Sequence, residues 1–189
     1  MFLLTKPGVA DLEKFLDHRV NDSLSYREVG ATRDVPPADF TVDHNRIKIG
    51  HGAADFEAAC QAIRNWKMFD LGWVELFRTD TPIEVGRNVA ILVNHLGFWS
   101  LSSARIVYTI EEEFRYGFAY GTLTEHAEIG EERFSVEFDA ITGEVWYDLL
   151  AFSRPAALLA KLGYSISRYY QRRFAEDSKR AMARHLVPE

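Results

Sequence analysis

The strongest constraint on the fold is a run of β-type segments in the second half of the chain, followed by one long amphipathic helix. These segments are rich in β-branched and aromatic residues and are separated by short turns, a pattern that predicts successive strands. The five predicted strands cover residues 85–93, 104–110, 115–126, 132–138 and 145–152. Because short connections join antiparallel neighbours, the pattern predicts an antiparallel meander.

Helical patterns flank this meander. Apolar residues at three- and four-residue steps predict helices at residues 9–20, 53–69 and 166–186, and a short strand is expected at residues 40–49. The triplet Ser153-Arg154-Pro155 suggests a helix start, followed by a short helix and a hinge at Gly163. A sheet with one apolar face must be covered, so we expect an α+β fold with the meander wrapped on the C-terminal helix.

Composition indicates one globular domain. The chain has 189 residues, 47% of them hydrophobic and 26% charged, which is ordinary for a single folded unit. We expect a single domain over residues 1–189, with a helical extension at 1–25 and the main domain at 26–186. The 22 Lys and Arg residues against 28 Asp and Glu give a net charge of −6, which argues against binding to nucleic acid or to an anionic membrane.

The sequence also predicts a cellular location. No apolar run approaches the roughly 20 residues needed to span a bilayer. The single cysteine, Cys60, excludes an internal disulfide and fits a reducing compartment. We therefore expect a cytoplasmic protein.

The register of the hairpin near residue 130 is constrained by burial. A three-residue loop at residues 128–130 would place His126 opposite Glu132 and Tyr120 opposite Phe138. The predicted inward face then carries Phe118, Tyr120, Thr122, Thr124, His126, Glu132, Phe134, Val136 and Phe138. The opposite face, expected in water, carries Arg133, Ser135, Glu137 and Asp139.

Several short motifs are spread along most of the chain. They include Tyr26-x-Glu28-x-Gly30-x-Thr32, Tyr120-Gly121-Thr122-Leu123-x-x-His126-x-Glu128-x-Gly130-Glu131-Glu132-x-Phe134, Val145-Trp146-Tyr147, Ala151-Phe152-Ser153-Arg154-Pro155 and Gln171-x-x-Phe174. On these motifs the chain resembles, from about residue 26 to residue 182, the bacterial and plant family called domain of unknown function 1990. The resemblance implies a relation to helix-grip proteins of the Bet v 1 and START-like type, in which a curved sheet wraps a long helix and leaves a cavity. It implies no mechanism.

The polar end of the predicted inward face supplies the candidate ligand contacts, which are Tyr120, Thr122, Thr124, His126 and Glu132. A carboxylate opposite His126 would fix its tautomer and prepare the other ring nitrogen to take or give a proton. His126 and Glu132 are therefore the candidate catalytic residues. The same pair can instead contact a ligand without catalysis, or satisfy itself at a strand end.

Arg154 is the second candidate, at the predicted corner between the sheet and the helix. Its forked donors suit a carboxylate or phosphate, or they form a structural bridge to Glu132 or Glu28. The glycines of Gly50-His51-Gly52 predict a tight turn into a helix and no dinucleotide site, because the surrounding topology is antiparallel. The histidines show no metal-ligand spacing, so we expect neither a metal nor a cofactor.

These features favour a domain that binds a small, mostly apolar or amphipathic ligand between the sheet and the C-terminal helix. One alternative is an enzyme of cyclase or hydrolase type that uses His126 and Glu132 for acid–base chemistry in the same pocket. Another is a protein-interaction module with an exposed helix or sheet edge. The ligand and the oligomeric state stay open.

Overall fold

An antiparallel sheet organises the fold in the computed structural model, which describes residues 1–95, 97–124, 126, 128–156 and 164–186. The strands are β1 (Phe2–Leu3), β2 (Thr41–His51), β3 (Val74–Phe77), β4 (Asn88–His95), β5 (Phe98–Glu112), β6 (Arg115–Thr122), β7 (Glu128–Phe138) and β8 (Glu144–Pro155). The helices are α1 (Val9–Asp17), α2 (Ala53–Arg64) and α4 (Tyr164–Arg184), with short 3-10 helices η1 (Ala31–Arg33) and η2 (Lys67–Phe69). The strand order is β2-β8-β7-β6-β5-β4-β3, and β1 pairs with β5.

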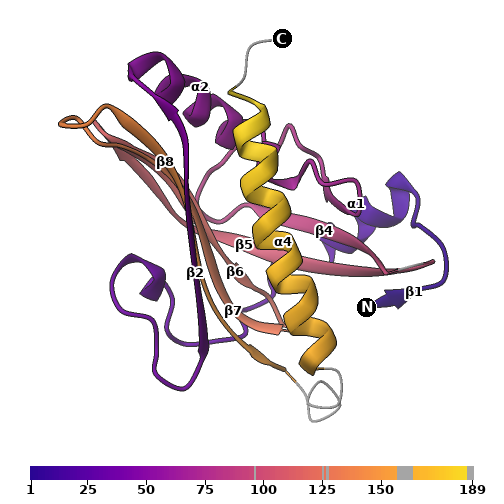
Figure 1. Cartoon of the computed structure of the whole chain (residues 1–189). Helices are drawn as coiled ribbons and strands as arrows, with labels where there is room; N and C mark the ends of the chain where they lie inside the picture. Colours follow the sequence, from indigo (N-terminus) through magenta and orange to yellow (C-terminus); the bar gives the residue numbers. More distant parts are fainter. Residues whose placement is uncertain (96, 125, 127, 157–163, 187–189) are drawn as a thin grey trace.

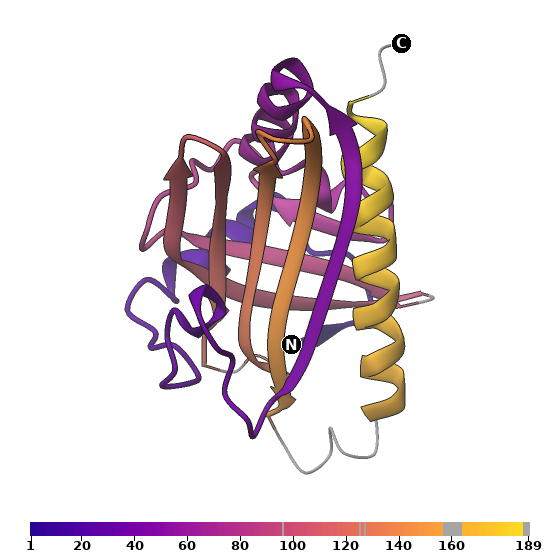
Figure 2. The same ribbon diagram turned by 60° about the vertical axis from the view of Figure 1, so that its left-hand side comes forward.

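The predicted order of elements is confirmed. Strands β4 to β8 follow one another across the sheet as a meander, and β2 pairs with the far edge of β8. Figure 1 shows α4 along the inner face of the curled sheet and α1 on the opposite face. Figure 2 shows β7, β8 and β2 side by side, with α4 next to β2. The chain thus has the helix-grip arrangement that its sequence predicted.

One expectation about element boundaries is wrong, and two others concern residues outside those that the structure describes. Ser153-Arg154-Pro155 does not start a helix, since β8 continues to Pro155 and pairs with β7 up to Glu128. Pro155 is compatible with this strand because it lies at its end. The predicted short helix after the triplet and the hinge at Gly163 lie outside the described residues. Strands β1 and β3, with two and four residues, are too short to leave a periodic signal.

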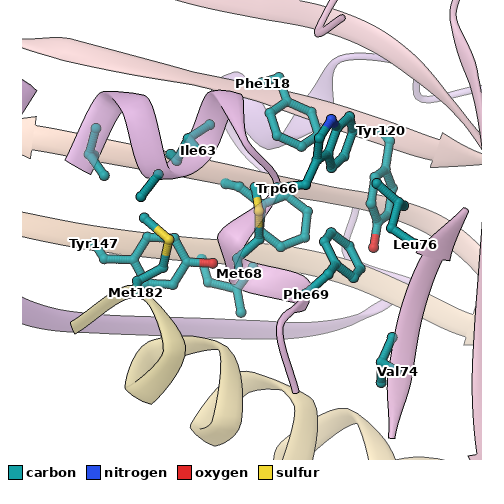
Figure 3. Close-up of a cluster of buried hydrophobic side chains, with 14 of the residues drawn as sticks. Ile63, Trp66, Met68, Phe69, Val74, Leu76, Phe118, Tyr120, Tyr147 and Met182 are labelled. Carbon is teal, nitrogen blue, oxygen red and sulfur yellow. The ribbon is translucent and has the colours of Figure 1, made fainter. Parts of the chain in front are cut away.

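The predicted helix at residues 53–69 is divided in two. Gly52, with φ of 88°, turns the chain from β2 into α2, and this confirms the predicted turn at the two glycines. Trp66 adopts the left-handed conformation with φ of 55° and redirects the chain into η2. As a result Trp66, Met68 and Phe69 lie between the sheet and α4 (Figure 3), where they are exposed by 1%, 0% and 4%.

The outer face of the sheet is covered as well. Helix α1 packs Leu12 and Phe15 against Leu92 of β4 and Leu101 of β5. The segment before β2, residues 24–40, lies over β6, β7 and β8 through Tyr26, Phe40 and η1. The prediction that Arg133 and Ser135 face water is therefore wrong, since they are only 7% and 0% exposed.

The hairpin between β6 and β7 has a longer connection than predicted. Tyr120 pairs with Glu132, and Phe118 pairs with Phe134; Tyr120 was expected opposite Phe138, so the register moves by six positions. The hydroxyl of Thr122 bonds to the amide and carbonyl of Gly130 at 3.0 and 3.2 Å, in place of a further backbone pair. Because the shift is even, the predicted residues that lie within the two strands keep their inward face, whereas Thr124 and His126 lie beyond the end of β6 and do not belong to that face.

Candidate functional site

A row of side chains crosses the inner face of the sheet at the level of Glu132. The strand registers place four residues in this row: Asp43 of β2, Ala151 of β8, Glu132 of β7 and Tyr120 of β6. Neighbouring strands are about 4.8 Å apart, so Asp43 and Glu132 are about 10 Å apart along the row. The small side chain of Ala151 is the one between these two carboxyl groups.

Glu132 and Tyr120 form a hydrogen-bonded pair within this row. The phenol oxygen of Tyr120 donates to Oε2 of Glu132 at 2.7 Å. The pKa of Glu132 is raised to about 7, mainly by burial; the hydrogen bond from Tyr120 opposes this rise, and the charge of Asp43 adds to it. Burial also raises the pKa of Tyr120, so the phenol stays protonated. Near neutral pH, Glu132 is thus able to donate or to accept a proton.

The floor of the inner face changes character at this row. On one side the next row is apolar and buried, with Leu149, Phe134 and Phe118 exposed by 2% or less. On the other side the next row consists of small or polar residues, namely Thr41, Ser153, Gly130 and Thr122. Glu132, Ala151 and Ser153 are partly exposed. The inner face is therefore filled with large rings at one end and lined by small residues at the other.

The first turns of α4 bind to this small-residue end. The guanidinium of Arg168 donates to both carboxyl oxygens of Asp43, one of them at 2.6 Å, and to Oε1 of Gln171 at 2.7 Å. Gln171 in turn donates to the hydroxyl of Ser153 at 2.9 Å. Asp43 and Arg168 were not singled out from the sequence. A sequence pattern could have indicated these contacts, because Arg168 and Gln171 are polar residues three positions apart and so share one side of the helix.

The structure separates the predicted site residues. Tyr120 and Glu132 lie together on the inner face, and the buried Thr122 hydroxyl is used by Gly130. Thr124 is exposed, and both Thr124 and His126 line a pocket on the other side of the sheet. The expected pairing of His126 with Glu132 is wrong, because Tyr120 occupies the position opposite Glu132.

Arg154 does not join the inner-face residues either. Its guanidinium donates to Asp39 at 2.8 Å and lies over the ring of Phe40 at 4.4 Å. The side chain is 46% exposed and forms no bridge to Glu132 or Glu28. The reason is strand alternation: once β8 continues through residue 154, Arg154 shares the outer face with Phe152.

The motif at residues 26–32 has a clear structural partner in Glu131. The Tyr26 hydroxyl and the Gly30 amide donate to one carboxyl oxygen at 2.7 Å each, and the amide and hydroxyl of Thr32 donate to the other, the amide at 3.0 Å. Glu131 is 2% exposed. Four donors thus satisfy a buried carboxylate, and we call this arrangement the outer clamp. Gly121 lies beneath it, where a Cβ atom would overlap the Tyr26 side chain.

Two further features concern possible ligands. Among the described residues, no group of three or more His, Cys, Asp or Glu side chains is arranged to hold a metal ion. In the same part of the chain, no helix combines the length and apolar character required to cross a membrane.

Comparisons with known proteins identify the family. The family model described as a domain of unknown function, DUF1990, matches residues 25–181. A UPF0548 protein of Dictyostelium discoideum is 37% identical over 199 residues, covering 94% of this chain and 92% of the relative. A UPF0548 protein of Deinococcus radiodurans is 36% identical, covering 97% and 98%. A hypothetical protein from Helicobacter pylori has a similar fold, with a TM-score of 0.59 at 11% identity over 88% of this chain and 97% of that chain. The chain therefore belongs to the DUF1990 family, as its motifs predicted, and its family has no assigned activity to transfer to the site described above.

Proposed function

We propose that this chain is a ligand-binding domain that holds a small, mostly apolar molecule between the inner face of the sheet and α4. Residues 26–186 form the binding unit and residues 1–25 extend it. The observation that carries the proposal is the partly exposed carboxyl group of Glu132, hydrogen-bonded to the buried Tyr120 at the boundary between the large-ring and small-residue parts of the inner face. The pair supplies polar groups that could orient a ligand, next to a row of small side chains on the sheet.

The chemistry of the surroundings supports an amphipathic ligand. The ring centroids of Phe69 and Phe174 are 5.4 Å apart, and both rings are within 6.3 Å of Phe134. Phe69 and Phe134 are buried, and Phe174 is the partly exposed ring of the three, so Phe174 supplies the apolar surface. A hydroxyl, amine or carbonyl group on the ligand would find a matching donor or acceptor in Glu132 and Tyr120. We therefore assign the apolar part of the ligand to the ring surface and its polar group to the acid–phenol pair.

The enzyme alternative loses its main support. It depended on a histidine whose tautomer is fixed by Glu132, and the residue opposite Glu132 is Tyr120. A binding role uses the same two side chains without a reacting histidine. We propose a cytoplasmic location for this role, supported by the free, buried thiol of Cys60.

Native mass spectrometry of the purified protein tests the proposal. We expect a small molecule that is retained in the native protein and released in denaturing solvent. Ala151→Phe should abolish this retention, because a large ring would fill the floor beside Glu132. Val42→Phe is the matched control: Val42 is 47% exposed on β2, and this variant should keep the molecule.

A probe covers the case of a ligand lost during purification. The apolar dye 1-anilinonaphthalene-8-sulfonate should fluoresce on the wild-type protein and on Val42→Phe, and much less on Ala151→Phe. Urea unfolding of each variant confirms that it is folded. The proposal is contradicted if the three folded proteins retain the same mass and bind the dye equally.

A further inference from the structure

A pocket lies on the opposite side of the sheet from α4. It has a volume of about 170 Å³ and is lined, among the described residues, by Met1, the α1 region, β5 and the loop after β6, and the amino group of Met1 donates to the carbonyl of Leu101 at 2.9 Å. Figure 1 shows α1 and α4 on opposite faces of the sheet. A single water needs only about 10–15 Å³, so this pocket has room for a small organic molecule. The proposed function does not account for this pocket, although His126 of the central motif lines it.

The tautomer of His126 can be read from its hydrogen bond. The amide of Glu128 donates to Nδ1 of His126 at 3.0 Å. An acceptor nitrogen carries no proton, so in the neutral ring the proton is on Nε2. Burial lowers the pKa of His126 to about 4, which keeps the ring neutral at physiological pH. His126, which lines the pocket, thus carries a fixed Nε2–H donor.

The pocket has one polar side and one apolar side. Arg19 lies over the Phe15 ring, with 3.8 Å between the guanidinium carbon and the ring centroid, and donates to the Phe15 carbonyl at 3.3 Å. Arg19, Ser103 and His126 belong to the polar part of the pocket lining. Phe15 and Leu101 supply the apolar side and belong to the core cluster beneath α1.

We propose that this pocket binds a short-chain carboxylic acid as its carboxylate. The carboxylate lies at Arg19 and the His126 Nε2–H, and the alkyl chain lies against Phe15 and Leu101. An arginine guanidinium and a neutral N–H donor match the two oxygens of a carboxylate. Phosphate fits less well, because its charged oxygens would be desolvated against the apolar side without partners.

Nuclear magnetic resonance of the histidine side chains tests this site. Titration of the full chain with butyrate should move the His126 ring signals to saturation, while those of His185, at the other end of the sequence, serve as the internal control. Acetate should bind several-fold more weakly, since it lacks the alkyl contact. Inorganic phosphate and butyramide, which lack either the alkyl chain or the charge, should produce no saturable shift.

Two variants establish the role of the cation. Arg19→Gln should weaken butyrate binding about tenfold or more, as expected for loss of a charge-assisted contact. Arg180→Gln, a matched change at a side chain that is 69% exposed on α4, should bind butyrate as the wild type does. If Arg19→Gln does not fold, His126→Phe takes its place, with binding followed on the butyrate signals.

Three results would overturn the inference. One is the absence of a saturable shift of His126 with butyrate. Another is binding of phosphate at least as tight as that of butyrate, which would make the pocket a general anion site. The third is unchanged butyrate affinity in a folded Arg19→Gln or His126→Phe variant. Because the pocket and the Glu132 pair are on different faces, failure here leaves the proposed function untouched.

Discussion

Glu131 and Glu132 look equivalent in the sequence, and comparing Glu131→Gln with Glu132→Gln distinguishes their roles. Glu131 is on the outer face, where its carboxylate accepts from Tyr26, Gly30 and Thr32 in the outer clamp. Glu132 is on the inner face, where it accepts from Tyr120. At both positions, the change from glutamate to glutamine leaves the volume of the side chain nearly the same. The difference between the two variants therefore reports the hydrogen bonding of each carboxyl group.

The magnitude follows from counting acceptors in the outer clamp. Glutamine keeps one acceptor oxygen and replaces the other with an NH₂ donor. Each carboxyl oxygen of Glu131 accepts one hydroxyl and one backbone amide. The hydroxyls can reorient to accept, whereas the amide of Gly30 or that of Thr32 loses its acceptor in either orientation. An orphaned buried donor costs about 1–3 kcal/mol, and loss of charge adds to this, so we expect Glu131→Gln to lower the free energy of unfolding by about 2–4 kcal/mol.

Urea denaturation at pH 7 measures this difference. Glu132→Gln should not lower the free energy of unfolding, because glutamine still accepts from Tyr120 and no longer carries a charge that burial disfavours. The slope of the transition should stay the same in both variants, as expected for an unchanged folded state. Equal losses in the two variants, or a larger loss in Glu132→Gln, would refute the assignment of structural and functional roles to the two acids.

Three further predictions follow from the geometry. The pKa of Glu132 is raised from 4.5 to about 7, so its contribution to stability is present below pH 4.5 and lost as pH rises toward 7. Urea titrations across this range should show wild type losing stability relative to Glu132→Gln. Gly121→Ala should cost about 1–3 kcal/mol in thermal unfolding, because its methyl group overlaps the Tyr26 ring, and Tyr26→Ala should relieve part of that cost. Arg154→Ala should change stability by less than about 1 kcal/mol and leave the retained mass unaltered in native mass spectrometry.

The fold was predictable because its main elements are long and periodic. The meander and α4 each carry an apolar pattern over many residues, which tertiary contacts reinforce. The outer face was not predictable in the same way. Arg133 and Ser135 alternate with buried residues and look solvated, yet both are buried, and Arg133 donates to the carbonyl of Thr32, 101 positions away in the chain. A polar residue that faces a distant polar segment gives no local signal of burial.

The candidate site was predictable only in part. Alternation along β6 and β7 correctly placed Tyr120 and Glu132 on the inner face, and an even register shift preserved that result. The identity of the partner depended on the loop length, because the end of β6 is set by the side chain of Thr122 and by the bridge from Leu24 to Leu123. The sequence therefore identified the correct face for Glu132 and assigned it the wrong partner.

The motif around Glu131 and Glu132 has a structural role on the outer face of β7 and a proposed functional role on its inner face. Glu131 points outward into the clamp, and the outer clamp holds β7 through four hydrogen bonds to a segment distant in sequence. Glu132, the next residue, is positioned by the same backbone and points inward. The clamp therefore explains the residues of the motif that bind Glu131 as requirements of folding. Glu132 has no comparable structural demand, since one hydrogen bond, from the buried Tyr120, holds its partly exposed carboxyl group. This asymmetry is the physical reason to look for function on the inner face.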